Sequence, residues 1–155
     1  MAITSSRATS FIVECLSGVH LTTDTYKYLL IKPGHAGTYG KLTQNVGTPG
    51  TGTPSVTNVG TDEASGTGYT SGGFALGAPS ISLSTDGLTA RYDFPDPSAI
   101  SNATLSAVGL IIYNSTKSGK VVGCWDFGGT VTSTAAPFDV NLPAAGDATS
   151  LIRIS

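Results

Sequence analysis

The 155-residue chain has few charged side chains, and this scarcity excludes one class of function. Only 12% of its residues are charged, and the net charge is -2. That is about half the usual share for a soluble domain. Eight scattered Lys and Arg residues cannot form the basic patch that binding to nucleic acid requires. We therefore expect no nucleic-acid partner. So weakly charged a surface protects an isolated monomer poorly, which suggests that much of the surface is covered by another molecule.

The sequence also lacks long apolar runs. None approaches the roughly 20 residues that a membrane-spanning helix needs. The first 18 residues contain one basic residue, and Glu14 interrupts their apolar run, which is not typical of a secretory signal. We predict that the protein has no membrane partner and is made in a cytoplasm. Cys15 and Cys124 are then expected to be reduced and buried rather than joined in a disulfide.

Residues that could carry catalysis are scarce. His20 and His35 are the only histidines, and neither belongs to a group with metal-ligand spacing. The close carboxylate pairs are Asp62-Glu63 and Asp93-x-x-Asp96, which we interpret as solvated turn caps. A glycosidase pair facing across a cleft remains the alternative for them. We predict no enzyme activity, no metal and no cofactor.

The chain length predicts one domain over residues 1–155. A short helix is expected in SSRATSFIVECLSG, where Ala8, Phe11, Ile12, Cys15 and Leu16 recur at helical spacing and Gly18 is placed to end it. The stretch Val19–Lys32 predicts a strand with a break at Thr23-Asp24. Residues 33–61 are rich in Gly and Pro, and we interpret them as a long loop or extended arm.

Strand patterns dominate the rest of the sequence. Alternating segments around Ile81 and Tyr92 are separated by Asp86-Gly87, which predicts a two-residue hairpin turn. The apolar run Val108–Tyr113 predicts a central strand covered on both faces, and Ser118-Gly119 predicts a turn after it. The fold class is therefore mainly β: a jelly-roll-like β-sandwich or partly open barrel of about 7–9 short antiparallel strands.

The glycine-rich stretch TDEASGTGYTSGG raises the question of a phosphate-binding loop. Ser71 stands where a dinucleotide-binding motif needs its third glycine, and the following residues are strand-like, so no helix N-terminus is available for a phosphate. We interpret the stretch as a tight corner with positive φ and closely approaching backbones, in which Tyr69 is the buried anchor. The corner residues are Gly66, Gly68, Tyr69, Gly72 and Gly73.

Several segments together resemble a known protein family. TTDTYKYLLI (residues 22–31), EASGTGYTSGG (63–73), LIIYN (110–114) and WDFGG (125–129) are similar to segments of small virion structural proteins of tailed bacteriophages, in particular the capsid decoration or cement type. The resemblance covers most of the chain except residues 33–58. It implies a β-sandwich that binds the outside of an icosahedral shell as a small symmetric oligomer, a homodimer or homotrimer, with no catalytic residues.

The predicted function is therefore that of a capsid cement protein on the virion exterior, with the major capsid protein as its partner. Edge strands and the 33–61 segment are the expected contact elements, because an open edge or an arm can add to the sheet of a partner. The alternatives are a carbohydrate- or receptor-binding fibre or tail module, with Trp125 or the tyrosines as stacking platforms, and a head-tail or tail structural protein. The candidate contact residues are Gly34, Tyr39, Leu42, Val46, Val56 and Val59.

Overall fold

The computed structural model describes residues 1–143 and 150–154. It is mainly β, with one short helix and eight antiparallel strands in two sheets, which confirms the predicted fold class. The elements are β1 (Ser6–Arg7), α1 (Thr9–Leu16), β2 (Tyr26–Ile31), the 3-10 turn η1 (Gly60–Asp62), β3 (Phe74–Ala75), β4 (Ser80–Leu83), β5 (Ala90–Asp93), β6 (Ile100–Asn114), β7 (Lys120–Phe138) and β8 (Ile152–Ile154).

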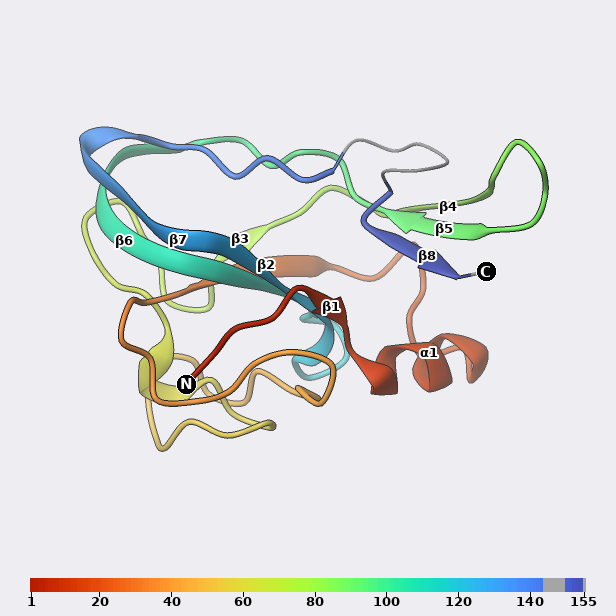
Figure 1. Ribbon diagram of the computed structural model, residues 1–155, viewed down its shortest axis with the longest axis horizontal. Helices are drawn as coiled ribbons and strands as arrows, with labels where there is room; N and C mark the ends of the chain where they lie inside the picture. The colour runs from red at the N-terminus through yellow and green to blue at the C-terminus, as the bar shows by residue number, and fades with distance from the viewer. Residues whose placement is uncertain (144–149, 155) are drawn as a thin grey trace.

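The larger sheet has the strand order β1-β7-β6-β2-β3, and a long hairpin of β6 and β7 forms its centre (Figure 1). The prediction of a central strand at 108–113 is confirmed, because β6 pairs with β7 on one side and β2 on the other. The expectation of uniformly short strands is wrong, since β6 has 15 residues and β7 has 19. The register between them shifts at four places. Such irregularities bend a strand and divide its alternation pattern, so that the sequence suggests several shorter strands.

The smaller sheet has the order β4-β5-β8. The predicted hairpin joins β4 to β5, but its connection is longer than two residues. Ser84 N–H donates to the Thr89 carbonyl at 2.8 Å, which leaves four residues in the loop. Gly87 has φ +73°, whereas Asp86 is not among the described residues with positive φ. The Asp86 carboxylate instead accepts from Leu88 N–H at 3.0 Å, and this side-chain bond to the backbone stabilises the wider loop.

The predicted helix is confirmed as α1, and Gly18 follows it with φ +69°. Phe11 lies fully buried on its inner face, whereas Leu16, which the helical pattern placed on that face, is 86% exposed. The predicted break at Thr23-Asp24 is also confirmed: a turn closed by Leu21 N–H to Asp24 Oδ2, at 3.0 Å, precedes β2.

Aromatic side chains join the two sheets to α1. Tyr92 on β5 donates its hydroxyl to that of Tyr26 on β2 at 2.8 Å. The ring of Phe94 lies 5.2 Å from that of Tyr26, and the ring of Phe11 lies 5.2 Å from that of Tyr92, both in edge-on contact. Edge-to-face packing of this kind adds to the hydrophobic stabilisation of each ring. The helix and the smaller sheet are thus attached to the larger sheet through one cluster.

This packing predicts different effects for two substitutions in the same helix. Phe11→Ala should lower the free energy of unfolding by about 3–5 kcal/mol, because it removes a buried ring. Val13→Ala should change it by only about 0.5 kcal/mol or less, because Val13 is 63% exposed. Urea denaturation measures both, and equal effects would contradict this placement of the helix.

Candidate functional site

The glycine-rich corner lies against β2 and β6. Gly68, Gly72 and Gly73 have φ of +81°, +84° and +70°, and Gly66 has φ +152°. A Cβ atom on Gly73 would overlap the Tyr28 carbonyl, and one on Gly66 would overlap the Thr104 carbonyl. Both glycines are therefore required by close approach of two backbones.

A buried carboxylate holds this corner together. Glu63 is 5% exposed. Its Oε1 accepts from Gly72 N–H at 2.6 Å and from the Tyr69 hydroxyl at 3.0 Å, and its Oε2 accepts from the Ser71 hydroxyl at 2.7 Å. The Tyr69 hydroxyl also accepts from Leu30 N–H on β2 at 3.1 Å. Burial first, and the nearby Glu63 charge second, raise the pKa of Tyr69 above its ordinary value.

Three backbone donors of the corner, the N–H groups of Tyr69, Gly72 and Gly73, are already used within the domain. Gly72 N–H is bound to Glu63, and Gly73 N–H donates to the Thr70 carbonyl at 2.9 Å. An anion here would also meet the buried carboxylate. The structure therefore places all five corner residues in a scaffold, with Tyr69 half-buried as the link to β2.

Asp62, the neighbour of Glu63, organises a different segment. It is 1% exposed. Its Oδ1 accepts from Ala36 N–H at 2.8 Å, and its Oδ2 accepts from Gly37 N–H at 2.6 Å and from the Tyr39 hydroxyl at 2.7 Å. Burial alone would raise the pKa of Asp62, but these three hydrogen bonds outweigh it and hold the pKa below its ordinary value. The expectation that Asp62 and Glu63 are solvated caps is therefore wrong.

These bonds, with others, fold residues 33–61 back onto the domain. Val46 N–H donates to the Gly119 carbonyl at 3.0 Å, and Thr9 N–H donates to the Lys41 carbonyl at 2.8 Å. The segment is consequently a folded loop rather than an extended arm. Figure 1 shows it below the larger sheet, on the left side of the view.

The candidate contact residues of the loop fall into two groups, one buried and one exposed. Tyr39, Val46 and Val59 are at most 2% exposed and belong to the core. The loop packs these side chains against its own domain, and only Tyr39 among them also lines the hollow described below. Gly34, Leu42 and Val56 lie on the surface.

An apolar hollow lies between the N-terminal segment and this loop. Its volume is about 470 Å³, and it is lined by Thr4, Ser6, Thr38, Tyr39, Gly40, Lys41, Leu42 and Val56. Leu42 is 64% exposed and Val56 is 41% exposed. A concave apolar site bordered by exposed aliphatic side chains suits an apolar group of a binding partner.

A second polar cluster could in principle carry acid–base chemistry. His20 Nε2 lies 2.9 Å from Glu14 Oε2, and its Nδ1 lies 3.2 Å from Asn114 Nδ2. Asn114 Nδ2 also donates to Asp24 at 2.8 Å, and Lys120 pairs with Glu14. With the Asn114 amide as donor, His20 is the neutral Nε2–H tautomer, and neither ring nitrogen is free for a substrate. The cluster therefore links α1 to the β6–β7 turn and does not form a general base.

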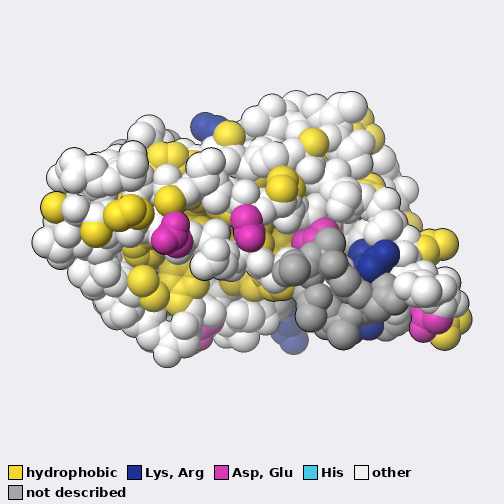
Figure 2. Space-filling model, turned by 90° about the horizontal axis from the view of Figure 1, so that it is seen from above, with side chains coloured by type: hydrophobic (Ala, Val, Ile, Leu, Met, Phe, Trp, Pro, Cys, Tyr) yellow, Lys and Arg dark blue, Asp and Glu magenta, His cyan; other side chains and the backbone are white. Residues whose placement is uncertain are grey.

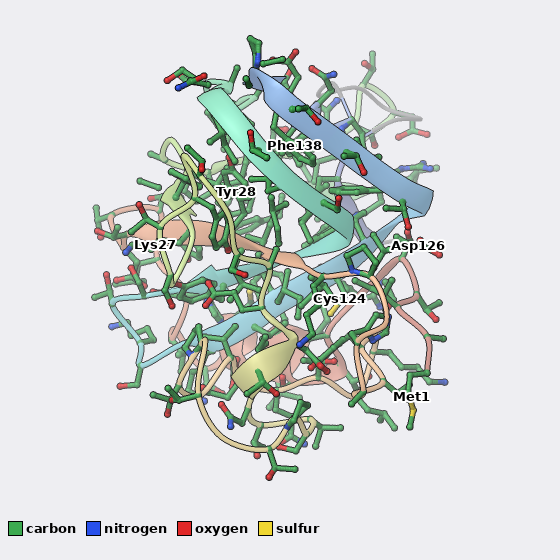
Figure 3. The ribbon with its side chains drawn as sticks, turned by 90° about the vertical axis from the view of Figure 1, so that its left-hand side faces the viewer. Met1, Lys27, Tyr28, Cys124, Asp126 and Phe138 are labelled. Atoms are coloured by element: carbon green, nitrogen blue, oxygen red, sulfur yellow. The ribbon has the colours of Figure 1, made fainter. Side chains whose placement is uncertain are left out.

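The remaining candidate reactive groups are the two cysteines and the Asp93–Asp96 pair. Cys15 and Cys124 are free, and burial raises their pKa to about 11 and about 12, so neither is a ready nucleophile. Cys124 lies on β7 (Figure 3), where its Sγ lies 3.8 Å from the Gly40 carbonyl. Asp93 and Asp96 accept backbone N–H groups of Leu151 and Leu142, and both line a hollow of about 380 Å³. Asp93 is 2% exposed, so the expectation that it is a solvated cap is wrong.

No group of His, Cys, Asp and Glu that could hold a metal ion occurs within residues 1–143 and 150–154. In that same part of the chain, no helix has the length and apolar character needed to cross a membrane. Acidic side chains lie separately along an apolar strip of the face shown in Figure 2.

Comparison with known proteins identifies no relative. No protein family, no curated protein and no solved structure matches this chain.

Two glycines allow a matched test of the corner. Gly73 and Gly87 have nearly the same φ, +70° and +73°, but only Gly73 has a backbone in the way of a Cβ. Gly87→Ala should cost about 1–2 kcal/mol of unfolding free energy for the left-handed backbone alone. Gly73→Ala should cost about 4 kcal/mol or more. Chemical denaturation measures the unfolding free energy of both variants. If both lose a similar amount, the corner is not tightly packed and the prediction is wrong.

His20 should make stability depend on pH. Burial lowers its pKa below 6.5, although hydrogen bonding to Glu14 acts in the opposite direction. Below pH 6.5 the unfolded chain then takes up a proton that the folded chain resists, so the free energy of unfolding should fall as the pH falls from 7 toward 5. His20→Gln should remove this part of the slope, and His35→Gln should retain it. Parallel slopes for wild type and His20→Gln would contradict the assignment.

Proposed function

We propose that this protein is a non-enzymatic structural protein of a bacteriophage virion, a cement protein that binds the outer surface of the capsid shell and stabilises it. Its partner is the major capsid protein, and it is made in the cytoplasm of the host bacterium. The observation that carries the proposal is the apolar hollow bordered by Leu42 and Val56 on the folded loop. The resemblance of residues 63–73 to phage virion proteins supports the choice of partner.

The side chains that line the hollow suit the binding of a protein partner better than the catalysis of a reaction. Leu42 and Val56 are aliphatic, and the hollow contains one cation, Lys41, and no carboxylate. An apolar side chain of a shell protein can be buried there without leaving a charge unpaired. A modest patch on each subunit is sufficient, because many copies on one shell add their contacts through avidity.

The loop also meets the requirement that a contact surface be ordered before it binds. Asp62 fixes the turn at Ala36 and Gly37, and main-chain bonds fix the loop against β7. An ordered surface loses less conformational entropy on binding than a free arm does. Deletion of this loop would remove core side chains, so point substitutions at its surface are the appropriate test.

The test uses purified protein and empty, undecorated phage shells. Leu42→Asp and Val56→Asp should each weaken binding about tenfold or more, because an unpaired carboxylate would enter an apolar contact. Leu16→Asp is the matched control: Leu16 is 86% exposed and lies on α1, outside the loop, so binding should be unchanged. Wild-type protein should bind at a stoichiometry set by the icosahedral lattice and raise the melting temperature of the shell.

Two other outcomes would contradict parts of this proposal. If wild-type protein binds but all three variants bind equally well, the loop is the wrong contact element. If wild-type protein does not bind shells, the cement proposal fails, and quenching of Trp125 fluorescence by saccharides would then test the fibre alternative. Trp125 is half-buried, and its ring lies over Gly123.

A further inference from the structure

The described sheet edges differ in how well they are protected from other strands. β1 and β3, at the edges of the larger sheet, have two residues each. Very short edge strands are one of the ways in which proteins avoid pairing with a second chain. β4, at one edge of the smaller sheet, has four residues, Ser80–Leu83, and all four are exposed. It contains no charged residue and no proline of its own, so two of the usual protections are absent from the strand itself.

The pairing register shows which backbone groups of β4 are open. Ser84 N–H donates to the Thr89 carbonyl, so these two residues form a hydrogen-bonded pair. Such pairs alternate along an antiparallel ladder, which makes Ser82 and Arg91 the next one. The N–H and C=O groups of Ile81 and Leu83 therefore point away from β5, toward the open edge. The Arg91 guanidinium donates to the Leu83 carbonyl, which has a second lone pair for another donor.

The side chains of β4 extend a buried face into solvent. Ile81 lies opposite Tyr92, and residues directly opposite each other in a ladder share a face of the sheet. That face is buried at Tyr92, which is 5% exposed, but Ile81 is 59% exposed and Leu83 is 63% exposed. The apolar inner face of the smaller sheet thus continues across β4, where its side chains are exposed.

We propose that β4 pairs with β4 of a second copy of this chain, in antiparallel register about a twofold axis that passes beside Ser82. Ile81 of one copy then lies opposite Leu83 of the other, and their outward N–H and C=O groups bond to each other. The two three-stranded sheets become one six-stranded sheet. A twofold axis perpendicular to the sheet keeps Ile81 and Leu83 of both copies on the same face, where the four side chains bury one another.

Charge selects a second copy as the occupant. A strand that pairs with itself brings identical residues close together, so a charged strand would repel its own copy. Residues 77–85, GAPSISLST, have no charge, so self-pairing brings no charged residues of β4 opposite each other. The Arg91 guanidinium bound to the Leu83 carbonyl is a cation that each copy brings to this edge. The proposal does not depend on the shell-binding role, since segment 33–61 lies on the left side of Figure 1 and β4 lies on the right.

Sedimentation equilibrium or native mass spectrometry of the full chain tests the proposal. Wild-type protein should show a dimer, at twice the 15.7 kDa of the monomer. Ile81→Lys should give a monomer with an unchanged melting temperature when both are measured at a concentration where the wild type is also dissociated. Leu88→Lys is the matched control, because Leu88 is 75% exposed in the adjoining loop and should leave the dimer intact.

A second variant separates strand pairing from general hydrophobic association. Ile81→Pro removes the outward N–H, which the β4–β5 ladder does not use, and proline is tolerated at such edge positions. It should abolish the dimer while the monomer stays folded by circular dichroism. A monomeric wild type, a dimer that survives both Ile81 substitutions, or equal dissociation by Leu88→Lys would each overturn the proposal.

Discussion

Two adjacent buried carboxylates, Asp62 and Glu63, determine the conformation of the loops around the larger sheet. Asp62 accepts three hydrogen bonds from the segment that begins the long loop, and Glu63 accepts three from the glycine-rich corner. A buried carboxylate is costly unless its oxygens are bonded, so each side chain requires its own set of donors. Because the two residues are consecutive, and Glu63 bridges to Ile31 at the end of β2, both loops are fixed relative to the same strand.

This arrangement explains how a chain with little charge and no catalytic cluster in its described residues presents defined surfaces. The backbone of the long loop is bonded internally and to β7, and its apolar residues divide between the core and the apolar hollow beside the N-terminal segment. At the other end of the molecule, the smaller sheet ends in the exposed strand β4. The two proposed contacts, to a shell at the loop and to a second copy at β4, therefore use separate surfaces. A protein that ties subunits together needs at least two such surfaces.

Local patterns in the sequence were sufficient to predict the helix, the central strand and the fold class. Helical spacing with Gly18 predicted α1, and the unbroken apolar run at Val108–Tyr113 predicted the interior of β6. The conformation of the long loop could not be predicted, because the partners of Asp62 lie 25 and 26 residues away and no local pattern links them. The prediction of a two-residue hairpin turn was wrong because the Asp86 side chain bonds to the backbone and stabilises a four-residue loop. The length of β6 and β7 was hidden by irregular pairing that interrupts their alternation.

Hydrogen exchange at single amides, followed by NMR, tests the central role of the carboxylate pair most directly. The amides of Gly37 and Gly72 lie in glycine-rich loops, where exchange is ordinarily fast, but each donates to a buried carboxylate at 2.6 Å. The account predicts that both exchange as slowly as the amides of Ile111 and Ile112 in the centre of β6, because both would be released only by the opening of the folded domain. Exchange of Gly37 and Gly72 at the rate of an exposed loop amide such as Thr53 would contradict it.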